Sequence, residues 1–170
     1  MSDTTSDDAL HAAGLALAQA VANALDLPEG EPLQPLAFVG RGSDLRLVQF
    51  AAPAAEPALT KGRQESETWR SAGSPWALAC NGQLASDDPT VDVLIVDLWG
   101  PGMEEPLRIE QAYLPSHGPE KLKVLGPMRL RRHDQGVPAP EVVPLVARIM
   151  RGMARHPQAR SVWSHWAEAS

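Results

Sequence analysis

Three apolar runs decide the fold of this chain: WALACNGQL at Trp76–Leu84, VDVLIVDL at Val91–Leu98 and PLRIEQAYL at Pro106–Leu114. The segments between them, ASDDP at 85–89 and WGPG at 99–102, are rich in Asp, Gly and Pro, which favour tight turns. Short apolar runs joined by such turns predict an antiparallel meander.

Further strands are predicted on both sides of this meander. Leu122–Leu130 predicts a fourth strand, broken or bulged at Gly126-Pro127 because proline cannot donate to a sheet. Upstream, Leu36–Val39 and Leu45–Phe50 flank the sequence GRGS, and two apolar runs around a glycine-rich loop predict a hairpin. The sheet is therefore expected to have about five or six strands.

Helical spacing marks the rest of the chain. Residues 8–26 predict an amphipathic N-terminal helix, 59–72 a polar middle helix, and 141–154 a C-terminal helix followed by a short one that begins at Pro157. We expect an α+β fold with the helices packed mainly on one face of the sheet, a disordered tail at 1–7 and one domain at 8–170.

The second turn sets one strand pairing. If it is centred just after Gly102, Asp97 lies opposite Arg108 and Ile95 lies opposite Glu110. The first turn sets the next pairing, and a centre near position 87 places Cys80 opposite Leu94. A slip of one residue would exchange the two faces of a strand.

These registers predict two different sheet faces. The core face holds Trp76, Leu78, Cys80, Leu94, Val96, Leu98, Leu107, Ile109 and Tyr113. The second face is mixed and holds Ala77, Ala79, Asn81, Val91, Val93, Ile95, Asp97, Arg108, Glu110 and Ala112. Such a face is too apolar for free solvent and too polar for a core, so it is either half-exposed or a protein contact, most simply with a second copy.

Composition excludes several classes of protein. A chain of 170 residues with 44% hydrophobic side chains can bury its own core, so it needs neither a metal nor disulfides to fold. The single Cys forms no internal disulfide, and no apolar run has the length of a membrane span. The acidic start is unlike a signal peptide, so we expect a soluble cytoplasmic protein with no membrane contact.

Charge is unevenly distributed along the chain. Residues 1–120 carry 6 basic and 18 acidic side chains, whereas residues 121–170 carry 9 basic and 3 acidic ones. Arg148, Arg151 and Arg155 recur at helical spacing and are candidate anion-binding residues, although solvation or internal pairing explains them more simply. Trp163 and Trp166 are candidate partner anchors, or they pin the last helix to the body.

Residues suited to catalysis are few. Asp97, Arg108 and Glu110 form the best polar cluster for acid–base work, and a simple ion pair explains them equally well. Cys80 lies among apolar residues, where a thiol is usually inert. The five histidines show no metal-ligand spacing, so we expect no metal and no cofactor.

Several short motifs lie along the predicted meander: Cys80-Asn81-Gly82, Thr90, Asp92, Leu94-Ile95-Val96, Gln111–Pro115 and Gly126-Pro127. With these motifs the chain resembles a group of small bacterial proteins to which no reaction is assigned. The resemblance covers residues 76–130, implies the meander and supplies no catalytic residue.

Three functions remain open at this stage. The leading hypothesis is a non-enzymatic module that binds another protein or a second copy of itself. The alternative is a small-molecule-binding or hydrolytic enzyme with its site at Asp97, Arg108 and Glu110. The third is a weak anion or nucleic-acid binder that uses the C-terminal arginines.

Overall fold

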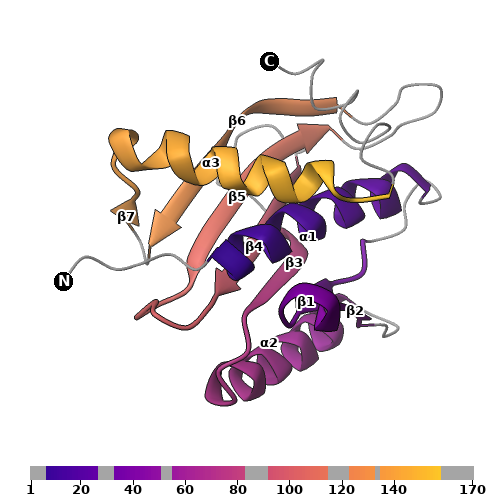
Figure 1. The fold of residues 1–170 in the computed structure, drawn as a ribbon. Coiled ribbons are helices and arrows are strands. Elements are labelled where there is room, and N and C mark those ends of the chain that lie inside the picture. The colour runs from indigo at the N-terminus through magenta and orange to yellow at the C-terminus, as the bar shows by residue number, and fades with distance from the viewer. Residues whose placement is uncertain are drawn as a thin grey trace.

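The structure is a computed structural model that describes residues 7–26, 33–50, 55–82, 92–114, 123–132 and 135–157. Its elements are α1 (Asp7–Asp26), β1 (Leu36–Val39), a short 3-10 helix (Gly42–Asp44), β2 (Arg46–Gln49), α2 (Ala55–Ser71), β3 (Trp76–Gly82), β4 (Asp92–Trp99), β5 (Leu107–Leu114), β6 (Lys123–Arg132), β7 (Gln135–Gly136) and α3 (Ala139–Ala154). This is the predicted α+β fold, with more strands than expected (Figure 1).

The strands form one antiparallel sheet in the order β2-β1-β3-β4-β5-β6-β7. Both the hairpin of β1 with β2 and the meander from β3 to β6 are confirmed. The pairing of β5 with β6 shifts between Glu110 and Ala112, opposite residues 126–128, so the irregularity at Gly126-Pro127 is also confirmed.

The predicted register of β4 with β5 is correct, because Asp97 pairs with Arg108 and Ile95 with Glu110. The predicted register of β3 with β4 is wrong by one residue, since Cys80 pairs with Ile95 instead of Leu94. Trp76, Leu78 and Cys80 therefore share a face with Asp97, whereas Ala77, Ala79 and Asn81 lie on the face of Leu94 and Val96.

Burial on both sides of β3 explains this error. The first five residues of β3 are all buried, so no alternation of polar and apolar side chains distinguishes its faces. α1 covers one face of the sheet, and Gly62 of α2 approaches Leu78 on the other. A strand covered on both sides leaves its register to the turn that follows it.

α1 packs against both α3 and the strands β3 and β4, and it is buried along almost its whole length (Figure 1). Its many alanines bring it close to β3 and β4, because a small side chain permits a short distance between helix and sheet. α1 and α3 run in the same direction and contact each other at Gly14 and Gly152. A methyl group on Gly152 would lie 2.6 Å from the carbonyl oxygen of His11.

α2 covers the opposite face of the sheet, over β1 and β3. Trp69 of α2 packs against Phe50, with the two ring centroids 6.4 Å apart. Its last turn is fixed by Arg70, which stacks over Trp99 and donates a 2.6 Å hydrogen bond to the carbonyl oxygen of Glu104. This helix begins at Ala55, four residues before the predicted start.

The chain after β6 also differs from the prediction. No strand was predicted between Leu130 and residue 141, but Gln135–Gly136 forms β7 against Arg131 and Arg132. α3 begins at Ala139, two residues before the predicted start, so Pro144 lies in its second turn. Of the expected tail at 1–7, Asp7 is the first residue of α1, and the rest lies outside the described residues, as do Val91 and the last short helix with Trp163 and Trp166.

Candidate functional site

Seven residues on the α2 side of β4, β5 and β6 form the candidate site, which we call the β4–β6 surface. Its members are Ile95, Asp97, Arg108, Glu110, Ala112, Arg129 and Arg131. Strand pairing places Asp97, Arg108 and Arg131 in one row and Ile95, Glu110 and Arg129 in the next. All seven are half-buried or exposed.

The centre of the first row is a two-bond ion pair. Arg108 donates from Nε to Oδ1 of Asp97 at 2.8 Å and from Nη2 to Oδ2 at 3.1 Å. The hydrogen bond to Asp97 raises the pKa of Arg108 above its ordinary value. The pair occupies both carboxylate oxygens, and it confirms that the predicted cluster contains an Asp97–Arg108 ion pair.

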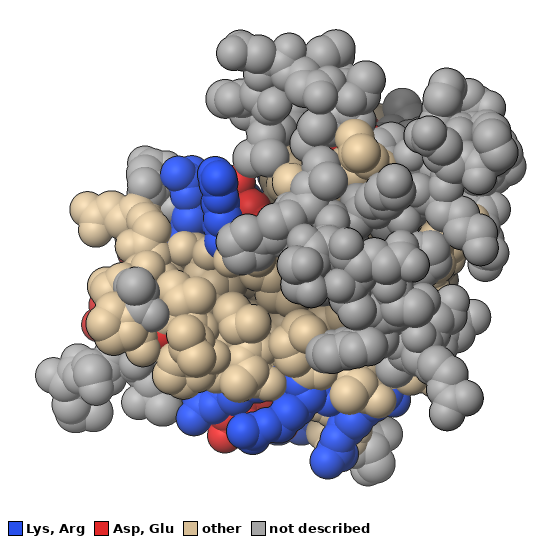
Figure 2. Space-filling model, turned by 90° about the horizontal axis from the view of Figure 1, so that it is seen from above, with Lys and Arg blue, Asp and Glu red and all other residues tan. Residues whose placement is uncertain are grey.

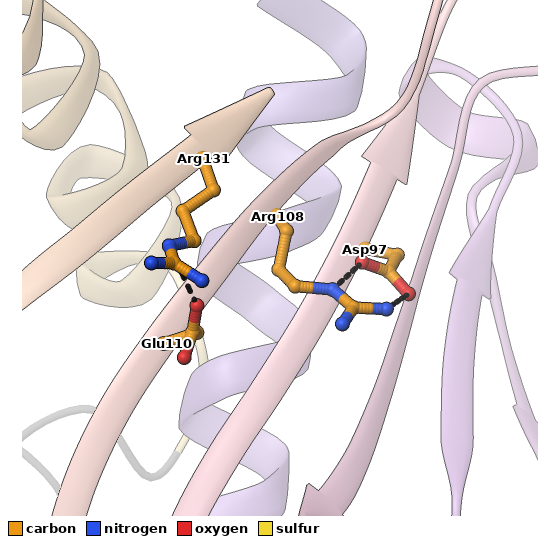
Figure 3. Close-up of polar contacts among 4 residues, drawn as sticks. All are labelled: Asp97, Arg108, Glu110 and Arg131. Carbon is orange, nitrogen blue, oxygen red and sulfur yellow. Dashed lines mark hydrogen bonds and ion pairs between the residues drawn. The ribbon is translucent and has the colours of Figure 1, made fainter. Parts of the chain in front are cut away.

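Glu110 belongs to a second ion pair, not to the first. Its Oε1 lies 3.3 Å from Nε of Arg131, on the neighbouring strand β6. Figure 3 shows both pairs on the side of the sheet that faces away from α1, with the arginine of each pair on the strand next to its carboxylate. Arg131 could not be predicted from the sequence as the partner of Glu110, because the pairing of β5 with β6 depends on the bulge.

Cys80 lies on the same face, on β3, and it is buried. Burial, followed by the nearby Asp97 carboxylate, raises the pKa of its thiol to about 11. The thiol is therefore protonated at neutral pH, and a protonated thiol is a poor nucleophile.

The arginines of the last third do not form one continuous patch. Arg131 pairs with Glu110, Arg132 with Glu141 at 3.0 Å and Arg148 with Asp7 at 3.4 Å. Figure 2 shows Lys and Arg side chains in two separate groups with uncharged surface between them. Arg148 and Arg151 are exposed on α3, and Arg155 is exposed directly after its end, away from the β4–β6 surface.

Two polar clusters were missed from the sequence. The Tyr113 hydroxyl donates a 2.6 Å hydrogen bond to Oδ1 of Asn81. Burial, followed by the charge of Asp92, raises the pKa of Tyr113 above its usual range. The predicted registers placed Asn81 and Tyr113 on opposite faces of the sheet, since their contact depends on the corrected register of β3.

The second missed cluster joins the ends of α1 and α3. A ring nitrogen of His156, Nε2, lies 2.9 Å from Oε1 of Gln19, and Nε2 of Gln19 donates at 2.8 Å to Oδ1 of Asn23. Burial lowers the pKa of His156. The contact spans 137 positions of the sequence, which no local pattern can indicate.

Among the described residues, no three His, Cys, Asp or Glu side chains come together as metal ligands would. The helices of that same part of the chain are too short or too polar to cross a membrane. The chain matches no protein-family model, no curated protein and no solved structure.

Proposed function

We propose that this protein binds another protein, without catalysing a reaction, through the β4–β6 surface. The observation that carries the proposal is that, within the part of the chain that the structure describes, helical cover on this side of the sheet comes from α2. α2 packs against β1 and β3, while Ile95 and Ala112 on the next strands stay half-buried beside charged groups. Apolar side chains set in a polar sheet face favour a surface that a partner completes.

The arrangement of the charges also supports binding. Protein interfaces combine an apolar centre with polar groups that fix orientation. Here the apolar side chains of Ile95 and Ala112 adjoin two ion pairs that are held in place by neighbouring strands. Rigid strands present these groups without the entropy cost of ordering a loop.

Catalysis receives less support from the same residues. A general acid or base must exchange protons near neutral pH, whereas Asp97 has both oxygens hydrogen-bonded to Arg108. The pKa of the Cys80 thiol, about 11, disfavours a nucleophilic role. The Asp97–Arg108 ion pair is therefore better suited to a fixed place on a binding surface than to proton transfer.

Site-specific photo-crosslinking in cells tests the proposal. A photoreactive residue replaces Ala112 on the β4–β6 surface, and the matched control replaces Val143, which is 73% exposed on α3. We expect one discrete crosslinked protein from position 112 and none from position 143. That protein is then identified by mass spectrometry and purified, and its binding should weaken with Arg129→Ala.

The outcomes separate the possible partners. A crosslink to a second copy of the chain, with a concentration-independent dimer by light scattering, supports self-association through this surface. A crosslink to a different protein supports a heterologous partner. Equal crosslinking from both positions, or binding that Arg129→Ala leaves unchanged, refutes the proposal.

A further inference from the structure

On the β4–β6 surface the guanidinium groups lie nearer to solvent than the carboxylates they pair with. The Arg108 side chain is 41% exposed against 22% for Asp97, and Arg131 is 49% exposed against 13% for Glu110. In both ion pairs the carboxylate side chain is therefore more buried than the arginine side chain. An approaching molecule meets positive charge first.

These arginines keep hydrogen-bond donors for a partner. A guanidinium carries five N–H donors in a planar fork. Arg131 directs Nε to Glu110, which leaves its two terminal nitrogens, and Arg108 keeps Nη1. Arg129 is exposed and has no ion pair among the described residues.

From this geometry we infer that the partner of the β4–β6 surface is an acidic protein segment whose carboxylates flank an apolar side chain. The inference rests on the proposed function and adds the chemistry of the partner. Carboxylates match the outward forks of the arginines, which bind them through paired hydrogen bonds. Ile95 and Ala112 receive the apolar side chain beside them.

Two other occupants fit this surface less well. Two copies placed face to face would bring their outward arginines together, and like charges in an interface are costly. A nucleic acid carries dense negative charge, which the net charge of −6 on this chain opposes at long range. A short acidic segment meets less of that repulsion.

The test measures the anisotropy of a short fluorescent peptide, in which glutamates flank a leucine, at low salt. The surface variant is Arg129→Gln with Arg131→Gln, and the matched control is Arg151→Gln with Arg155→Gln on α3. We expect about tenfold weaker binding for the surface variant, a change within about twofold for the control, and no binding of a lysine version of the peptide.

Because Arg131→Gln leaves the half-buried Glu110 without its partner, Arg129→Gln alone serves as a second variant that keeps both ion pairs. It should weaken binding in the same direction. No binding of the glutamate peptide, an equal loss in the α3 control, or displacement of the peptide by a DNA oligonucleotide at lower concentration overturns the inference. A crosslinked partner that contacts position 112 through a segment without acids overturns it too, and leaves the proposed function standing.

Discussion

Gly14 and Gly152 face each other at the crossing of α1 and α3, and the two backbones meet there without a side chain between them. A methyl group added at Gly14 would lie 2.6 Å from the amide nitrogen of Met153 and 2.8 Å from Cα of Gly152. It would come closer still to the carbonyl oxygen of Ile149. Backbone atoms cannot move aside as a flexible side chain can, so the helices must separate.

Gly14→Ala is expected to lower the free energy of unfolding by about 2–4 kcal/mol through overpacking. The sign is diagnostic, because alanine in place of glycine within an open helix stabilises by about 1 kcal/mol. Urea unfolding measures the change. Gly136→Ala is the control, since a methyl group there meets nothing within 4 Å, and it should change stability by less than about 0.5 kcal/mol.

The two tryptophans that pair across β3 and β4 should respond differently to phenylalanine. Nε1 of Trp99 donates a buried 2.9 Å hydrogen bond to the carbonyl oxygen of Met103, whereas Nε1 of Trp76 is buried and has no hydrogen-bond partner among the described residues. Trp99→Phe should cost about 1–2 kcal/mol more than Trp76→Phe, because only the former loses a hydrogen bond. Equal losses in thermal or urea unfolding would contradict this assignment.

Stability should fall at alkaline pH because of Cys80. Its pKa is about 11 in the folded protein and 9.0 in the unfolded reference, so the unfolded chain loses this proton first. The contribution is complete below pH 9 and declines between pH 9 and 11, by at most about 3 kcal/mol. The difference between wild type and Cys80→Ala, measured by urea unfolding across this interval, isolates it from other groups. A constant difference would refute the expectation.

Stability should also fall at acidic pH because of His156. Burial lowers its pKa from 6.5, so the unfolded chain binds a proton before the folded chain does. Its contribution is complete above pH 6.5 and is lost as pH falls through the folded pKa. His156→Gln should flatten this part of the stability profile, and the NMR titration of the ring should have its midpoint below 6.5. A midpoint above 6.5 would reverse the sign and sink the prediction.

Local chemistry made much of the fold predictable. The turn after Trp99 is short and rich in glycine, so the pairing of Asp97 with Arg108 follows from counting residues on either side of it. The periodicity of residues 8–26 located α1 to within one residue at its start. Both signals lie within a few positions of the structure they specify.

Long-range packing was not predictable in the same way. The predicted register of β3 was wrong because both faces of this strand are buried. β7 was not predicted because a strand of two residues carries no periodic pattern. Five of the seven residues of the candidate site were predicted to share one face, namely Ile95, Asp97, Arg108, Glu110 and Ala112. The pairing of Glu110 with Arg131 depends on the bulge of β6 at residues 126–128, whose exact form no local pattern specifies.

α1 leaves the ribosome long before α3, the helix that packs against it. α1 ends at Asp26, and α3, which covers it, begins only at Ala139. At ordinary rates of synthesis, of about 5–20 residues per second, an apolar helix waits on the order of 10 s for its cover. During translation α1 is thus an early-exposed segment on which chaperones are expected to act, and its native packing must await the synthesis of α3.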